Sequence, residues 1–122
     1  YDTPPILILD EVDKLKDPVL YFLITFYNDL KWKCSIVLFS TYYFKKRIED
    51  GVRNRKKGYE EIQSRFGTYI EFEETSAADV KLLSEAQGIK DSAAIKNIQK
   101  NCRGDLRKAE ELIMIYKTEK NV

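Results

Sequence analysis

Short apolar runs alternate with a helical pattern in the first part of the chain. Ile6–Leu9 and Ser35–Phe39 are almost continuous apolar runs of strand length, which is typical of strands buried on both faces of a sheet. Between them, apolar residues recur at helical spacing from Val19 to Leu30, after Asp17-Pro18. We expect Asp17 to cap this helix and Pro18 to be its first residue. The order predicts a βαβ unit with neighbouring parallel strands.

The pattern is less regular after the second strand. Residues 42–58 are first aromatic and then basic, and part of this segment, between Gly51 and Gly58, is expected to be a mobile loop. A short helix is predicted over Tyr59–Phe66. Thr68–Phe72 alternates in polarity and is predicted to be a third strand.

After Glu74 the pattern is helical throughout. Ser76-x-x-Asp79 resembles a capping box at the start of a helix that Gly88 closes. Asp91 or Ser92 is expected to cap a second helix, and Gly104-Asp105 precedes a third.

The sequence therefore predicts an α/β fold in two parts. Residues 1–74 are expected to contain a partial parallel sheet with its helices, and residues 75–122 a small three-helix subdomain. A chain of 122 residues is long enough to bury a sizeable core.

Composition excludes some classes of function. The chain has no histidine and two well-separated cysteines, so a zinc site is not expected. Its longest apolar run, from Val19 to Tyr27, is shorter than the roughly 20 residues of a membrane helix. No signal peptide is visible, and we expect a cytoplasmic protein that does not bind membranes.

Two carboxylates end the first apolar run. Asp10 and Glu11 directly follow Ile6–Leu9, at the strand end where open α/β sheets bind ligands. Asp10 can help to hold Mg²⁺, directly or through water, and Glu11 can polarise a water that attacks a phosphate. Ser40-Thr41 follows the second strand and would lie at the same edge.

This order of residues resembles the later part of an AAA+ ATPase core. The resemblance makes Asp10-Glu11 the Walker B motif, and it makes Ser40 or Thr41 sensor 1, with Thr41 preferred. Gln63-Ser64-Arg65-Phe66-Gly67 is similar to the segment that carries the arginine finger in the initiator and clamp-loader branch. The resemblance thus implies that Arg65 acts on the neighbouring subunit's nucleotide; Arg53 and Arg55 are rival fingers.

The most specific match lies in the last part of the chain. Arg103-Gly104-Asp105-Leu106-Arg107-Lys108-Ala109 resembles the Gly-Asp-x-Arg-x-Ala motif of the lid in the same branch. It implies that Arg107 is sensor 2, which contacts the γ-phosphate. Initiators and the ATPases of DNA transposition and target selection are the most similar members.

The resemblance also implies ATP and Mg²⁺ as cofactors and self-association into a ring or filament. The phosphate-binding motif Gly-x-x-x-x-Gly-Lys-Ser/Thr is missing from the chain, so we expect poor nucleotide affinity. We therefore expect a fragment of an ATPase that is inactive on its own and active in the complete protein.

A local basic segment suggests DNA as a partner. Although the whole chain has a net charge of only +1, basic residues concentrate between positions 45 and 57, where they can meet phosphates. The candidate DNA-binding residues are Lys45, Lys46, Arg47, Arg53, Arg55, Lys56 and Lys57.

Two other functions remain open. The chain can be a catalytically inactive module that binds nucleic acid or protein on the same scaffold. It can also be a metal-dependent nuclease that uses Asp10, Glu11 and Asp13, although no nuclease lysine motif follows these acids.

Overall fold

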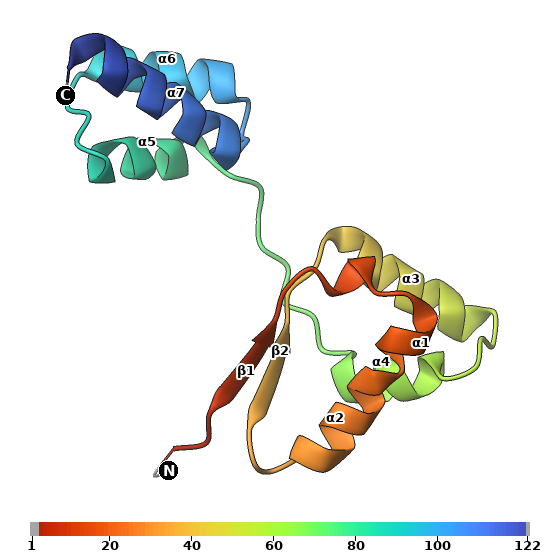
Figure 1. Ribbon diagram of the computed structural model, residues 1–122. Helices are drawn as coiled ribbons and strands as arrows, with labels where there is room; N and C mark the ends of the chain where they lie inside the picture. The colour runs from red at the N-terminus through yellow and green to blue at the C-terminus, as the bar shows by residue number, and fades with distance from the viewer. Residues whose placement is uncertain (1–2, 122) are drawn as a thin grey trace. The chain divides into compact units, whose positions relative to one another are not determined.

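The computed structural model describes residues 3–121 and divides the chain into two compact units, Tyr1–Ile70 and Glu71–Val122 (Figure 1). Each unit has its own apolar core. The sequence places this division slightly later, between residues 74 and 75. Helices dominate the described residues, and their sheet consists of two parallel strands. This arrangement is compatible with the predicted α/β class.

The two strands of the sheet lie in register over their whole length. β1 (Ile6–Leu9) pairs with β2 (Ser35–Leu38), so that Ile6 lies opposite Ser35 and Leu9 opposite Leu38. Hydrogen bonds continue past both strands, because Phe39 N donates to Leu9 O at 2.8 Å and Val12 N donates to Phe39 O at 3.1 Å. The segments after β1 and β2 therefore emerge side by side.

Only one face of the strand pair packs against the core. Leu9 and Leu38 contact the core cluster, and the helices of this unit lie on one side of the strands in Figure 1. Ile6 and Ile8 are 64% and 55% exposed. The expectation that both strands are buried on both faces is wrong for the first unit, because none of its described helices covers the second face.

The helix between the strands begins differently from the prediction. It consists of α1 (Asp17–Leu20) and α2 (Phe22–Leu30), with Tyr21 between them. The turn tightens there because Ile24 N donates to Tyr21 O, three residues back. Lys16 occupies the N-cap position, so the prediction that Asp17 caps the helix is wrong.

The basic segment folds largely as a helix. α3 (Tyr42–Arg53) extends past Gly51, where a loop was expected, and the connection to α4 (Tyr59–Phe66) is short. Buried Phe44, Ile48 and Gly51 lie on one face of α3, and their spacing explains the helix. The bounds of α4 agree with the prediction.

The predicted third strand over Thr68–Phe72 is wrong. The structure assigns neither helix nor strand to this segment. Ile70 and Phe72 are 85% and 86% exposed, and among the described residues no strand pairs with them. Alternating polarity alone does not make a strand, because a strand needs a neighbouring backbone for its hydrogen bonds.

The second unit consists of α5 (Ala77–Ala86), α6 (Ser92–Cys102) and α7 (Leu106–Lys120). The predicted caps are confirmed: Ser76 and Asp79 form a capping box, Asp91 accepts from Ala93 N, and Asp105 accepts from the first turn of α7. One apolar face of each helix meets in the core, which contains Val80, Ile89, Ile95, Ile98, Cys102, Ala109 and Ile113.

Candidate functional site at the carboxyl ends of the strands

The acid pair lies in an exposed turn directly after β1. Asp10 Oδ1 accepts from the backbone N–H of Glu11 at 2.8 Å. Glu11 has a φ of 57°, a left-handed conformation that is uncommon for residues other than glycine. Its carboxylate pairs with Lys14 Nζ at 2.7 Å, and both side chains are more than half exposed. The Glu11 carboxylate thus faces solvent at the strand end.

Thr41 joins the end of β2 to the turn that follows β1. Its hydroxyl donates to Asp13 Oδ2 at 2.9 Å, and its backbone N–H donates to Asp13 Oδ1 at 3.4 Å. The hydrogen bond from the Thr41 hydroxyl is the main cause that lowers the pKa of Asp13 below its ordinary value. Ser40 donates to the Thr41 carbonyl at 3.0 Å. Thr41 therefore lies at the edge of the sheet that the sequence predicts, and its hydrogen-bond partner there is Asp13.

This edge offers oxygen ligands of the kind that Mg²⁺ prefers. Mg²⁺ usually keeps several waters and takes one or two carboxylates together with substrate phosphates, which fits the exposed carboxylates of Asp10 and Glu11. Among residues 3–121, no three His, Cys, Asp or Glu side chains gather as a metal cage. Asp10, Glu11 and Asp13 each have a different partner, so the structure does not assemble the three acids of the nuclease hypothesis.

Arg65 packs against α2 of its own unit. Its Nε donates to Asn28 Oδ1 at 3.2 Å, its Nη1 donates to the Glu61 carbonyl at 3.2 Å, and its guanidinium lies 5.7 Å from the centre of the Tyr27 ring. The side chain is 25% exposed. Arg65 would have to leave these contacts to reach another subunit.

The rival fingers have fewer internal contacts. Arg53 pairs with Asp50 at 2.8 Å and its side chain is 70% exposed. Arg55 is exposed and has a left-handed backbone with a φ of 54°.

Four of the seven candidate DNA-binding residues are engaged within the chain. Arg47 and Lys56 bind Asp17, Arg53 binds Asp50, and Lys45 Nζ lies 5.4 Å from the centre of the Tyr69 ring. The side chains of the other three make no hydrogen bond or ion pair with the described residues and can turn towards a phosphate without breaking one; they are Lys46, Arg55 and Lys57.

Asp17 is the centre of a cluster that connects three helices. Its Oδ1 accepts from Arg47 Nη2 and from the Tyr59 hydroxyl, both at 2.6 Å, and its Oδ2 accepts from Lys56 Nζ at 2.6 Å. Hydrogen bonds from Lys56, Tyr59 and Arg47 hold the pKa of Asp17 far below its ordinary value. We call Asp17, Arg47, Lys56 and Tyr59 the Asp17 cluster.

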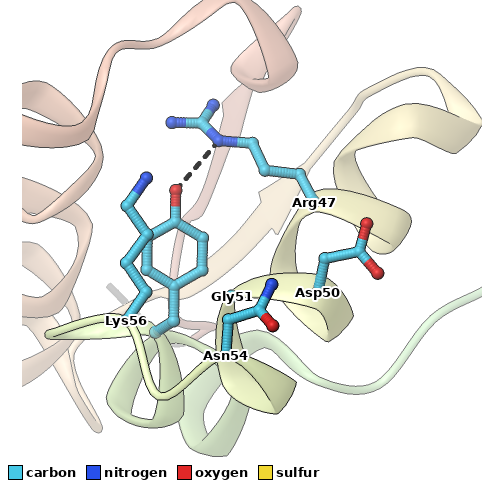
Figure 2. Close-up of a pocket in the computed structure, with 6 residues that line it drawn as sticks. Arg47, Asp50, Gly51, Asn54 and Lys56 are labelled. Carbon is cyan, nitrogen blue, oxygen red and sulfur yellow. Dashed lines mark hydrogen bonds between the residues drawn. The ribbon is translucent and has the colours of Figure 1, made fainter.

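A shallow cavity lies beside the Asp17 cluster. Its volume is about 270 Å³, and Arg47, Lys56 and Tyr59 form part of its lining. Figure 2 shows the Arg47 side chain above the aromatic ring, with Nε donating to the Tyr59 hydroxyl at 3.1 Å. Because the two cations already face Asp17, this cavity is a product of helix packing rather than a ready anion site.

Arg107 lies at the start of α7 in the second unit. Asp105 Oδ1 accepts from its backbone N–H at 2.9 Å, which fixes the first turn of the helix as the sequence predicts. The Arg107 guanidinium makes no hydrogen bond or ion pair within the described part of the chain. It is therefore available to a ligand.

Comparison with known proteins gives no match: no protein-family model fits the chain, and no curated protein or solved structure is significantly similar to it. In addition, none of the helices within residues 3–121 combines the length and the apolar character that crossing a membrane requires.

Proposed function

We propose that the chain is the Walker B-to-lid part of an AAA+-type ATPase that couples ATP binding and hydrolysis to DNA binding or remodelling. The observation that carries the proposal is the shared edge of β1 and β2. There the acids Asp10 and Glu11 and the hydroxyl of Thr41 emerge from adjacent parallel strands, and Asp13 bridges the two segments. Parallel α/β sheets bind ligands at such edges.

Each residue has a distinct role in this proposal. Asp10 holds the hydrated Mg²⁺ that accompanies ATP, and Glu11 polarises the attacking water. Thr41, or Ser40 beside it, senses the γ-phosphate. Arg107 contacts the phosphate from the helical unit, and its free guanidinium supports this role.

Charge supports the DNA part of the proposal. Lys46, Arg55 and Lys57 are exposed cations without internal partners in the described residues, and cations of this kind supply most of the affinity for a nucleic-acid backbone. Arg53, Arg55 and Arg65 remain the candidates for a finger that acts on the next subunit of a ring or filament. Arg53 and Arg55 require less rearrangement than Arg65.

ATP turnover tests the role of Glu11. The natural gene product that contains this sequence is compared with its Glu11→Gln form and with Glu60→Gln, a change of an exposed glutamate on α4. Loss of the group that polarises water is expected to slow turnover by about 100-fold or more while Mg-ATP still binds. The control is expected to keep full turnover.

Equal turnover in the Glu11→Gln and unchanged proteins would end the assignment of Glu11. Absence of ATP binding and turnover, together with retained DNA binding, would favour the inactive interaction module. Cutting of labelled DNA in Mg²⁺ or Mn²⁺ that Asp10→Asn abolishes would favour the nuclease.

A further inference from the structure

The turn between α2 and β2 presents an exposed tryptophan between two lysines. Its sequence is Lys31-Trp32-Lys33, and Trp32 is the only tryptophan of the chain. The Trp32 side chain is 88% exposed, and its φ of 70° lies in the left-handed region. A bulky residue is rarely found there, and conformational strain of this kind clusters at functional sites.

The backbone of this turn is well fixed. Lys31 N donates to Tyr27 O at 2.9 Å, and the N–H groups of Lys33 and Cys34 both donate to Leu30 O, at 2.8 and 3.1 Å. These bonds tie the turn to the last turn of α2. The backbone that carries the exposed indole is therefore already ordered, which lowers the entropy lost when a ligand binds.

Positive charge lies directly beside the indole. Lys31 Nζ is 5.3 Å from the centre of the Trp32 ring, within the range of a cation–π contact. Lys33 follows the ring in sequence, is exposed, and forms no hydrogen bond or ion pair through its side chain with the described residues. The turn thus combines one aromatic surface with two cations.

We propose that the turn Lys31-Trp32-Lys33 binds single-stranded nucleic acid, with Trp32 stacking on a base and the lysines contacting neighbouring phosphates. Base stacking on an aromatic side chain and cations along the backbone are the two components of such sites. The inference rests on the nucleic-acid part of the proposed function. The turn Lys31-Trp32-Lys33 is a different surface from the basic residues of α3, and binding to it does not depend on ATP hydrolysis.

The composition of the turn favours this ligand over a membrane or an apolar protein groove. An interfacial membrane anchor presents a broad apolar face, and a protein hot spot is surrounded by contacts that exclude water. In this turn the residues on both sides of Trp32 are exposed lysines. In a bound nucleic acid, phosphates would pair with the two lysines, and a base would stack on the indole of Trp32.

The single tryptophan makes the test direct. The full chain is titrated with an oligothymidylate of about 12 nucleotides, and its intrinsic fluorescence is recorded. Stacking of a base on Trp32 is expected to quench the fluorescence saturably. A duplex of the same length is expected to quench much less, because its bases are already stacked on one another.

Substitutions in the turn test which side chains bind the oligonucleotide. The affinity of each variant is measured by the fluorescence anisotropy of a labelled oligonucleotide. Trp32→Ala is expected to weaken binding about tenfold or more, and Trp32→Phe to restore part of the loss. Lys33→Gln is expected to reduce the salt dependence by about 0.7 in the slope of log K against log salt concentration. The matched control Phe22→Ala, which removes another exposed aromatic side chain, is expected to leave affinity unchanged.

The outcomes separate this inference from the proposed function. Binding without quenching, with equal affinity in Trp32→Ala, overturns the role of Trp32 and leaves the DNA contact of α3 intact. Absence of all oligonucleotide binding overturns both nucleic-acid contacts, and ATP turnover still decides the ATPase. A fluorescence change with phosphatidylserine vesicles but not with the oligonucleotide identifies a membrane contact and overturns the inference.

Discussion

Replacing Asp17 with asparagine is expected to lower the free energy of unfolding of the first unit by about 2–3 kcal/mol at neutral pH. The carboxylate accepts three hydrogen bonds, from Arg47, Lys56 and Tyr59, and hydrogen bonds to charged groups each contribute about 1.5–3 kcal/mol. The expected loss is smaller than their sum because Asp17 and Arg47 are each 27% exposed and water replaces part of the interaction. Urea unfolding followed by circular dichroism measures the change.

The same substitution changes how stability depends on pH. The pKa of Asp17 is lowered in the folded protein, so its contribution is fully present above the unfolded pKa of about 3.9 and is lost as pH falls towards the folded value. The difference between Asp17→Asn and the unchanged protein is therefore expected to shrink below about pH 4. Asp29→Asn, a change of an exposed acid on α2, serves as the control, and equal stability of all three proteins would contradict the structural role of Asp17.

Replacing Gly51 with alanine is expected to destabilise the first unit by about 2 kcal/mol or more. A methyl group at this position would lie 2.0 Å from Tyr59 Cδ1. Alanine gains about 1 kcal/mol in helix propensity over glycine, but the clash displaces a buried ring and its hydrogen bond to Asp17. In thermal unfolding, this corresponds to a fall in Tm of roughly 10 °C for a unit of this size.

The control is Glu49→Ala on the exposed side of the same helix. This substitution introduces alanine into α3 at an exposed position, away from the Tyr59 ring that Gly51 contacts, and the Tm is expected to stay the same or to rise slightly. Hydrogen exchange of the full chain locates the effect of Gly51→Ala, with faster exchange expected in α3 and α4 and no change in α5–α7. A Gly51→Ala protein as stable as the unchanged one would show that Tyr59 moves without loss.

Local sequence signals predicted the elements that depend on neighbouring residues. The capping box at Ser76, the cap at Asp105 and the bounds of α4 follow from patterns of a few residues. The prediction of a third strand over residues 68–72 was wrong because strand pairing depends on a backbone segment that is distant in sequence. Helix α3 was not predicted because its run of basic residues is also typical of a phosphate-binding segment, although Phe44 and Ile48 already have helical spacing.

In the candidate site, too, local patterns predict the positions of residues but not the contacts between distant segments. The position of Asp10 and Glu11 at a strand end follows from the break between apolar and acidic residues. The bond between Thr41 and Asp13 joins residues from different elements, and no short-range pattern contains it. For the same reason Arg47 and Lys56 were interpreted as DNA contacts, whereas their partner Asp17 was interpreted as a helix cap.

The parallel pairing of β1 and β2 also affects how quickly the chain folds. Ile6 meets Ser35 only after the whole intervening helical segment has closed into a loop, and such closure slows the search for the native state. The packing of α6 on α7, by contrast, joins helices that are adjacent in sequence. The helical unit is therefore expected to form first when the complete chain refolds from denaturant, and the strand pair to form last.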